Sequence, residues 1–367
     1  MLPRRLVPGQ IHAVTRRVRD RTFLLRPGAV VNQIVMYSLG VALERHAVDL
    51  YALLAESNHV HSLPGDRGGE SSALPDFHRD FHCLVARALN AHYGRGENFW
   101  RVGSYDNVEI HDQRSLEEQL LYLWSNPVKD GLVERPEDWP GVKFLPEDLG
   151  RTFTVERPDE AFFGGRLPDD WEPTDPTARR AHRHARRVVR REERRQRSLR
   201  GTRPGARPPK QRAPRPEPEN RRDRRTLPER VTFQIAVPPG YEHMSLEEVR
   251  AHFRRLLDAR VALIHEQRQA EGKTRFMGVE AVLTQDPRGT AGSTYPTFAR
   301  NPRIACLTSE VRVAVLGALR DWRREYRAAY VGWSDGDRTV LFPHGSYGIP
   351  RWHAGRVRGA TGPPALV

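Results

Sequence analysis

An arginine-rich segment in the middle of this chain of 367 residues limits how the chain can fold. Residues 179–230, the basic arm, contain 21 Arg and Lys against 6 Asp and Glu, and almost no apolar residue follows Val189 there. Such a composition cannot bury enough apolar surface to offset the entropy lost on ordering, so residues 200–228 are predicted to be disordered. Ordered structure is therefore expected on either side of the arm.

The chain is accordingly predicted to have three regions. These are a nearly neutral main domain over residues 1–150, a largely disordered linker rich in Arg and Pro over 151–230, and a smaller accessory α+β domain over 231–367. In the accessory domain, periodicity predicts a strand at 231–237 and helices at 245–270 and 308–331. A Ser-x-x-Glu capping box at Ser245 opens the first of these helices. The role of this domain is left open.

The apolar periodicity of the first region predicts the element order β-α-β-β-α-β-α. The strands are expected at 12–18, 48–54, 58–63 and 108–110, and the helices at 30–45, 75–94 and 115–127. This is the order of a ferredoxin-like α+β fold, one antiparallel sheet with helices on one face. Pro64 is expected to end the third strand early or to place it at an edge, because proline cannot donate to a central ladder.

Composition excludes several classes of protein. No apolar run approaches the roughly 20 residues that a membrane-spanning helix needs, so no membrane partner is expected. Cys83 and Cys306 are too few for a disulfide scaffold or a four-cysteine zinc site, and they fit a reducing cytoplasm. The arm has a net charge of +15 and the rest of the chain −1. The arm therefore indicates polyanion binding, and the expected location is cytoplasmic, in association with the nucleoid.

Two histidines, His59 and His61, flank Val60 on a predicted strand. Because side chains alternate along a strand, both imidazoles project from one face while Val60 enters the other. Two adjacent imidazoles suit a divalent metal ion. A pair of hydrogen-bonded or exposed histidines without a metal is an equally ordinary reading of this pattern.

A tyrosine and an asparagine share one face of the predicted helix 115–127. Tyr122 and Asn126 are four residues apart, beside an aliphatic stripe, so the tyrosine is a candidate nucleophile next to an amide. The pattern alone favours Tyr122 as a packing residue at the core edge. Tyr105, expected in a loop before the fourth strand, is a competing nucleophile.

Several motifs occur in order over about residues 8–150. They are Ser57-Asn-His-Val-His61, Phe81-His-Cys-Leu-Val-Ala-Arg87, Glu97-Asn-Phe-Trp100, Leu121-Tyr-Leu-Trp-Ser-Asn-Pro-Val128, Gly131-Leu-Val133 and Glu137-Asp-Trp-Pro-Gly141. Together they resemble the single-tyrosine HUH transposases, particularly the REP-associated-like branch. A Gly-Thr-Tyr-type N-terminal signature of that branch does not occur here, which puts recognition of hairpin tips in doubt.

The resemblance implies roles for individual residues. His59 and His61 match the pair that holds Mg²⁺ or Mn²⁺, Tyr122 matches the nucleophile, and Asn126 stands where a polar third ligand is found. The implied reaction is cleavage and rejoining of single-stranded or hairpin DNA through a 5′-phosphotyrosine. Both monomers and homodimers occur in the family.

Further DNA contacts are expected from arginines near the first strand and the second helix. The candidates are Arg16, Arg17, Arg19, Arg21 and Arg95. Arg95 together with Trp100 would pair a phosphate contact with base stacking. Each arginine also has a plain reading as a solvated charge, and Trp100 is expected in the core.

Two other functions are weighed against the transposase. One is a non-catalytic DNA- or RNA-binding protein that retains the fold. The other is an HUH relaxase or replication initiator, which would ordinarily carry a further tyrosine or a helicase module; neither a paired tyrosine nor a G-x-x-x-x-G-K-[ST] loop occurs in the sequence.

Deletion of the basic arm should weaken DNA binding and flatten its salt dependence, because the slope of log K against log salt follows the number of phosphates neutralised. Cleavage of a short oligonucleotide should persist. Fluorescence anisotropy across a salt series and a denaturing gel measure the two effects. Loss of cleavage on a short substrate would make the arm part of the active site.

Overall fold

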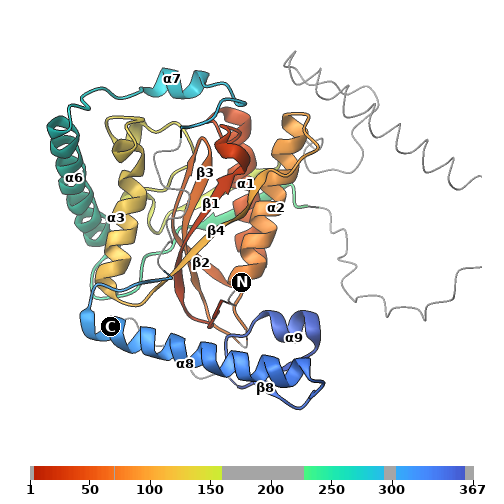
Figure 1. The fold of residues 1–367 in the computed structure, drawn as a ribbon. Helices are drawn as coiled ribbons and strands as arrows, with labels where there is room; N and C mark the ends of the chain where they lie inside the picture. The colour runs from red at the N-terminus through yellow and green to blue at the C-terminus, as the bar shows by residue number, and fades with distance from the viewer. Residues whose placement is uncertain (1–3, 70, 159–226, 293–302, 360–367) are drawn as a thin grey trace, which may run out of the picture.

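The computed structural model describes residues 4–69, 71–158, 227–292 and 303–359. The predicted disordered segment and almost all of the basic arm lie outside these ranges, apart from residues 227–230. Figure 1 shows a central sheet with helices on both sides and a long helix running across one end. Across the described residues, no helix is both long enough and apolar enough to span a membrane.

The main sheet has the strand order β2-β3-β1-β4-β7. Its strands are β1 (Ile11–Val18), β2 (Val48–Glu56), β3 (His59–Asp66), β4 (Trp100–Ile110) and β7 (Ile304–Ala305). The first four pair antiparallel in the ferredoxin-like order, which confirms the predicted α+β class. β7 adds a short parallel strand beside β4, so the complete sheet is mixed.

The helices cover both faces of this sheet (Figure 1). Helices α1 (Ala29–Arg45) and α2 (Leu74–His92) lie together on one face, as the ferredoxin-like order requires. Helix α3 (Gln113–Lys129) lies on the opposite face, where α6 (Leu246–Ala270) packs outside it. The Trp124 and Phe253 rings meet edge to face at 5.4 Å in the α3–α6 contact. The expectation of helices on one face therefore holds for α1 and α2 but not for α3.

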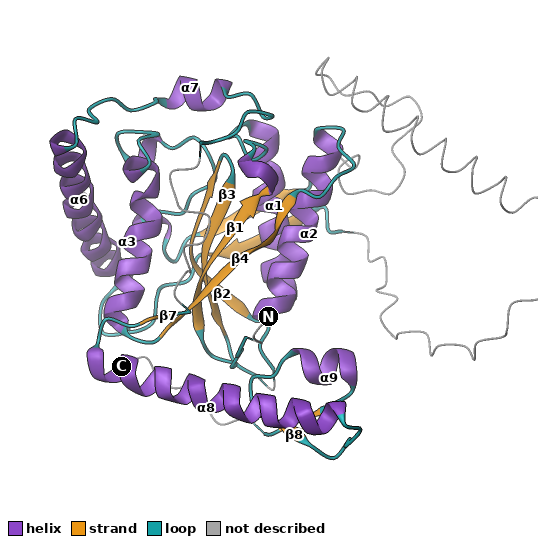
Figure 2. Cartoon of the chain, in the orientation of Figure 1, coloured by secondary structure: helices purple, strands orange, loops and turns teal. Residues whose placement is uncertain are grey.

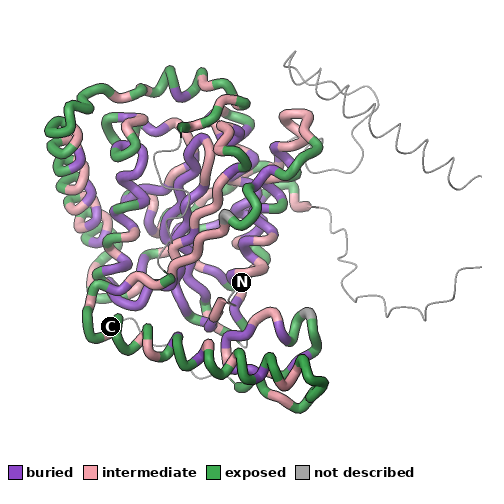
Figure 3. The backbone as a smooth tube through the Cα atoms, viewed as in Figure 1, coloured by how far each residue is buried: buried purple, intermediate pink, exposed green. Residues whose placement is uncertain are grey.

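One hydrophobic core joins segments that are far apart in the sequence. β5 (Thr152–Glu156) pairs with β6 (Arg230–Gln234), although β5 falls in the predicted linker. Val231, Phe233 and Phe253 belong to the same buried cluster as the sheet residues. Figure 3 shows this burial concentrated in the sheet and the helix faces that contact it. The core thus extends across the predicted domain boundary at residue 231.

The C-terminal elements are short apart from one helix (Figure 2). They are α7 (Val279–Thr284), α8 (Ser309–Ser334), β8 (Leu341–Phe342), α9 (Gly348–His353) and β9 (Arg356–Val357). Among the described residues, three 3-10 turns occur earlier, namely η1 (Arg19–Arg21), η2 (Pro136–Asp138) and η3 (Pro146–Asp148). Ala329, Phe342 and Ile349 form a small separate core under α8 and α9.

Pro64 lies inside an internal strand, so the expectation that it ends β3 or marks an edge is wrong. β3 continues to Asp66 between β2 and β1. Pro64 stands opposite Leu50, where the register between β2 and β3 shifts by one residue around Tyr51. This bulge interrupts the ladder at the position where proline has no N–H to donate.

Helix α3 begins earlier and ends later than the sequence indicated. The capping residue is Asp112, whose Oδ1 accepts a hydrogen bond from the Ser115 amide at 2.6 Å, rather than Ser115 itself. Pro127 stands within the last turn, and the helix continues to Lys129. Tyr105 lies in β4, which is much longer than the predicted strand, and not in a loop.

Asp112 also ties the C-terminal segment to the main core. Its Oδ2 accepts hydrogen bonds from the amides of Leu307 at 2.7 Å and Thr308 at 2.9 Å. Burial alone would raise the pKa of Asp112, but hydrogen bonds from Cys306, Thr308 and Ser115 outweigh it and hold the pKa well below its ordinary value. The ionised carboxylate is therefore the form that the fold stabilises.

Asp112→Asn should lower the free energy of unfolding by about 1–3 kcal/mol at pH 7, because buried amides lose a charged acceptor. Since the pKa is lower in the folded state, the stability from Asp112 is present above a pH of about 4 and is lost as the pH falls further. The variant should accordingly show a flatter decline in acid. Urea unfolding at several pH values measures this, with the exposed Asp138→Asn as matched control. Equal effects of the two substitutions would contradict the capping role.

Candidate active site

The two histidines of β3 project from the sheet face that α3 covers. His61 stands opposite Thr15 and His59 opposite Arg17 on the neighbouring strand β1. The two imidazole centroids are 4.6 Å apart, with the rings at 80° to each other. Val60 is buried in the core on the other side. The alternation predicted from the His-Val-His pattern is therefore present.

Each imidazole is held through its Nδ1 atom. Nδ1 of His59 lies 2.6 Å from Oδ1 of Asn58, and Nδ1 of His61 lies 2.8 Å from Oγ1 of Thr15. An amide oxygen only accepts, so His59 carries its proton on Nδ1 and leaves a lone pair on Nε2. Nε2 of His59 is 3.5 Å from Oε2 of Glu56, and Nε2 of His61 is 3.5 Å from Nδ2 of Asn126.

Burial keeps both imidazoles neutral. Desolvation, reinforced by Arg17 and Arg21, lowers the pKa of His59 to about 4. The pKa of His61 is lowered well below its ordinary value by desolvation first and then by His59 and Arg17. A neutral imidazole with an available lone pair is the form that binds a metal ion.

Helix α3 brings Tyr122 and Asn126 to the same place. The Tyr122 ring lies 5.9 Å from the His61 ring, edge to face, and the residue is 37% exposed. Asn126, one turn later, is 2% exposed. The Lys129 ammonium lies 4.7 Å from the centroid of the Tyr122 ring. A solvent-accessible tyrosine thus borders a buried polar cluster and carries a cation over its ring.

Glu56 is a member of this cluster that the sequence analysis missed. It is the last residue of β2, is 3% exposed, and accepts a hydrogen bond from Nδ2 of Asn126 at 3.1 Å. Burial, with a smaller contribution from Asp130, raises the pKa of Glu56 well above its ordinary value. The signal was available, because a two-residue turn at Ser57-Asn58 places Glu56 directly opposite His59.

The donor set of this cluster fits a divalent cation. The Nε2 lone pair of His59 and the Glu56 carboxylate are both acceptors and face one another at 3.5 Å, an arrangement that a proton or a metal ion stabilises. Within the described ranges, no group of three or more His, Cys, Asp and Glu side chains is arranged to hold a metal. Full coordination would therefore need the amide oxygen of Asn126, a movement of Glu56 or atoms of a substrate.

The five candidate DNA-binding arginines do not share one surface. Arg17 lies on the face of the two histidines, and Arg21, in η1, acts electrostatically on His59. Arg19 pairs with Glu97 at 3.1 Å. Arg16 points to the opposite face, because it pairs with Val60 and Tyr105 across the strands.

Trp100 does not form an exposed base-stacking surface together with Arg95. It is buried, and its Nε1 donates to the carbonyl oxygen of His82 at 2.9 Å, so the expected core position is confirmed. The cation nearest its ring is the guanidinium of Arg16, at 5.9 Å. Arg95 is half-buried just beyond α2.

Solved structures that are similar to this chain include two transposases. One is a REP-associated tyrosine transposase bound to a REP hairpin, with 20% sequence identity, coverage of 48% of this chain and 93% of that chain, and a TM-score of 0.35. The other is a transposase candidate from Deinococcus radiodurans R1, with 20% identity, coverage of 32% and 90%, and a TM-score of 0.25. At these values neither likeness carries an argument about the reaction.

No model of a known protein family matches the sequence. No curated protein matches it either. The roles of the site residues rest on their chemistry and arrangement.

Thr15→Val should lower the affinity for Mn²⁺ by about tenfold or more, because it removes the hydroxyl that orients His61. Thr15→Ser keeps that hydroxyl and should bind like the original chain. Isothermal titration calorimetry with Mn²⁺ measures both. Equal affinities of the two variants would show that the contact between Thr15 and His61 does not position a metal ligand.

Proposed function

We propose that this chain cleaves and rejoins single-stranded DNA through a covalent 5′-phosphotyrosine on Tyr122. The observation that carries the proposal is the position of Tyr122, exposed at the border of the buried cluster of Glu56, His59, His61 and Asn126. Nucleophilic catalysis requires this combination of an accessible hydroxyl and an oriented polar site. The motif resemblance points to Tyr122, His59, His61 and Asn126, but not to Glu56.

In the cleavage step, Oη of Tyr122 attacks the scissile phosphorus. The Oη–P bond forms and the P–O3′ bond breaks, the phenolic proton is lost, and the departing 3′ oxygen takes up a proton. The segment downstream of the break stays attached to Tyr122 through its 5′ phosphate, and the upstream segment ends in a free 3′-OH. Because one phosphodiester is exchanged for another, a 3′-OH can reverse the step and rejoin DNA. This chemistry suits a transposase more than a simple nuclease.

His59, His61 and Asn126 would hold a Mg²⁺ or Mn²⁺ ion, with Glu56 as the neighbouring carboxylate. Such an ion polarises a phosphoryl oxygen and orients the leaving group. The protein's own part is to keep the imidazoles neutral, through burial, and oriented, through Asn58 and Thr15.

Two positively charged side chains of the site would bind a phosphate. Lys129 lies over the Tyr122 ring, and Arg17 stands opposite His59 on β1. Positive charges fixed beside a phosphoryl group lower the cost of the charge that develops on its oxygens. Together they would position the phosphate between the tyrosine and the histidines. The motif resemblance also predicts that the chain binds hairpin DNA and that it is a monomer or a homodimer.

The binding-only alternative is not favoured. A protein that only bound nucleic acid would have no need for a buried cluster of two neutral imidazoles, a carboxylate and an amide, because unmatched buried polar groups are costly. The cluster lies next to an accessible tyrosine, where it serves a reaction.

Tyr122→Phe should abolish the covalent adduct with a single-stranded oligonucleotide in Mn²⁺, since the attacking oxygen is removed. Tyr105→Phe should still form the adduct, because Tyr105 lies on the opposite face of the sheet. A denaturing gel with labelled DNA detects the adduct. Persistence of the adduct in Tyr122→Phe would overturn the assignment.

His59→Ala combined with His61→Ala should remove metal-dependent cleavage and leave DNA retention largely intact.

A further inference from the structure

A cavity of about 650 Å³ lies on the sheet face opposite the two histidines. Its walls come from β1, β4, α2 and the C-terminal segment around α9. Arg351 of α9 pairs with Asp76 of α2 at 2.6 Å and holds the two walls together. In Figure 1, α9 lies at the end of α2, away from α3. The cavity is thus separated from Tyr122 by the sheet.

Several aromatic and imidazole rings line the cavity. His78 and His82, one turn apart on α2, stack with ring centroids 5.4 Å apart. Tyr105 meets His78 edge to face at 5.4 Å, and Trp100 and Tyr347 complete the wall. Flat apolar walls with a few polar groups select a planar ring among small ligands.

His78 gives the cavity an unmet hydrogen-bonding capacity. It is 3% exposed, and neither of its ring nitrogens has a hydrogen-bond partner among the described residues. Burial lowers the pKa of His78 to about 3, so the ring is neutral and offers one donor and one acceptor. Because the two nitrogens point in diverging directions, one ligand edge pairs with one of them, and a nucleobase edge carries both donors and acceptors that could do so.

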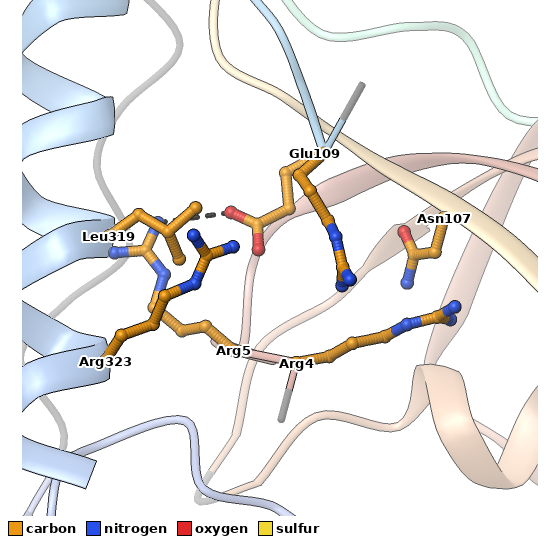
Figure 4. A pocket seen from close by; sticks show the side chains of 7 residues that line it. Arg4, Arg5, Asn107, Glu109, Leu319 and Arg323 are labelled. Atoms are coloured by element: carbon orange, nitrogen blue, oxygen red, sulfur yellow. Dashed lines mark hydrogen bonds and ion pairs between the residues drawn. The ribbon is translucent and has the colours of Figure 1, made fainter. Parts of the chain in front are cut away.

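A second, smaller space lined by arginines adjoins this cavity and shares Arg4 and Asn107 with it. Its charged residues are Arg4, Arg5, Arg303, Arg323 and Glu109. Figure 4 shows the guanidinium groups of Arg5 and Arg323 beside the Glu109 carboxylate, and Arg4 extending below Asn107. Arg5 pairs with Glu109 at 3.1 Å.

One carboxylate cannot balance four guanidinium groups. The Nε atoms of Arg5 and Arg323 are buried and have no hydrogen-bond partner among the described residues. Guanidinium groups in this number match the oxygens of a phosphate, which accepts several charge-assisted hydrogen bonds at once. The arginine space, defined by these four arginines, therefore places positive charge beside the cavity, with Arg4 at the boundary of the two.

We propose that the cavity and the arginine space together bind one nucleotide, with the base against His78 and the aromatic walls and the phosphate among the arginines. The nucleotide is either a residue extruded from a DNA strand or a free mononucleotide. A purely apolar ligand would leave the arginines and His78 unmatched, and an inorganic anion would leave the aromatic cavity unused. The inference does not depend on the chemistry of Tyr122.

Cys83 provides a direct measurement of occupancy. It is an exposed free thiol that lines the cavity, whereas Cys306 is buried. The rate at which a thiol reagent modifies Cys83 should fall when the cavity is filled. The experiment uses the full chain with Tyr122→Phe in EDTA, so that strand cleavage cannot contribute and failure of the proposed reaction does not affect the result.

Deoxyadenosine monophosphate is expected to slow modification of Cys83, while inorganic phosphate and deoxyadenosine alone are expected to protect much less. Protection by a single-stranded oligonucleotide but not by the mononucleotide assigns the site to an extruded DNA residue. Protection by both assigns it to free nucleotides as well. Unchanged rates with both would overturn the proposal.

His78→Phe keeps an aromatic ring but removes both unmatched nitrogens, and it should weaken the protecting affinity by about tenfold. Arg323→Gln should weaken it by a similar factor. Arg320→Gln, an exposed position on the same helix, is the matched control. In this variant the nucleotide should protect Cys83 as it does in the parent chain. Circular dichroism checks that each variant is folded. Protection that is insensitive to both His78→Phe and Arg323→Gln would refute binding in this cavity.

Discussion

The antiparallel pairing of β1 with β3 is the constraint on which both sites depend. Because successive side chains of a strand point to opposite faces, Thr15 joins His61 on one face while Arg16 joins Val60 on the other. A shift of the pairing by one residue would exchange these environments completely. Helix α3 then covers the two histidines. On the other face, Arg16 is enclosed by α2 and the C-terminal segment. One pair of strands thus separates a polar cluster that suits metal binding from an aromatic cavity.

Desolvation determines the electrostatics on both faces. It keeps His59, His61 and His78 neutral, and it makes a charge on Glu56 costly. Neutral imidazoles are lone-pair donors on the first face and hydrogen-bonding groups on the second. The exposed Tyr122 is different, because it stands at the border of its cluster, where a large substrate has access. Burial of the polar groups and exposure of the nucleophile are complementary requirements of one site.

The C-terminal half of the chain is part of the main structure. Phe253 packs against Trp124 of α3, the amide of Leu307 binds Asp112, and Tyr347 lines the cavity. These contacts explain how residues beyond the basic arm act on the fold of the first 150. They also mean that the aromatic cavity opposite the histidines exists only when the segment around α9 is in place.

The sequence by itself determined the local features. The element order, the shared face of His59 and His61, and the spacing of Tyr122 and Asn126 follow from periods of 2 and 3.6 residues, which neighbouring residues encode. Only the tertiary structure decided which partners meet. Glu56 joining Asn126 at 3.1 Å, the cap at Asp112 and the added strand β7 arise from contacts between distant segments. Periodicity gives the face on which a side chain lies, but packing decides what covers that face.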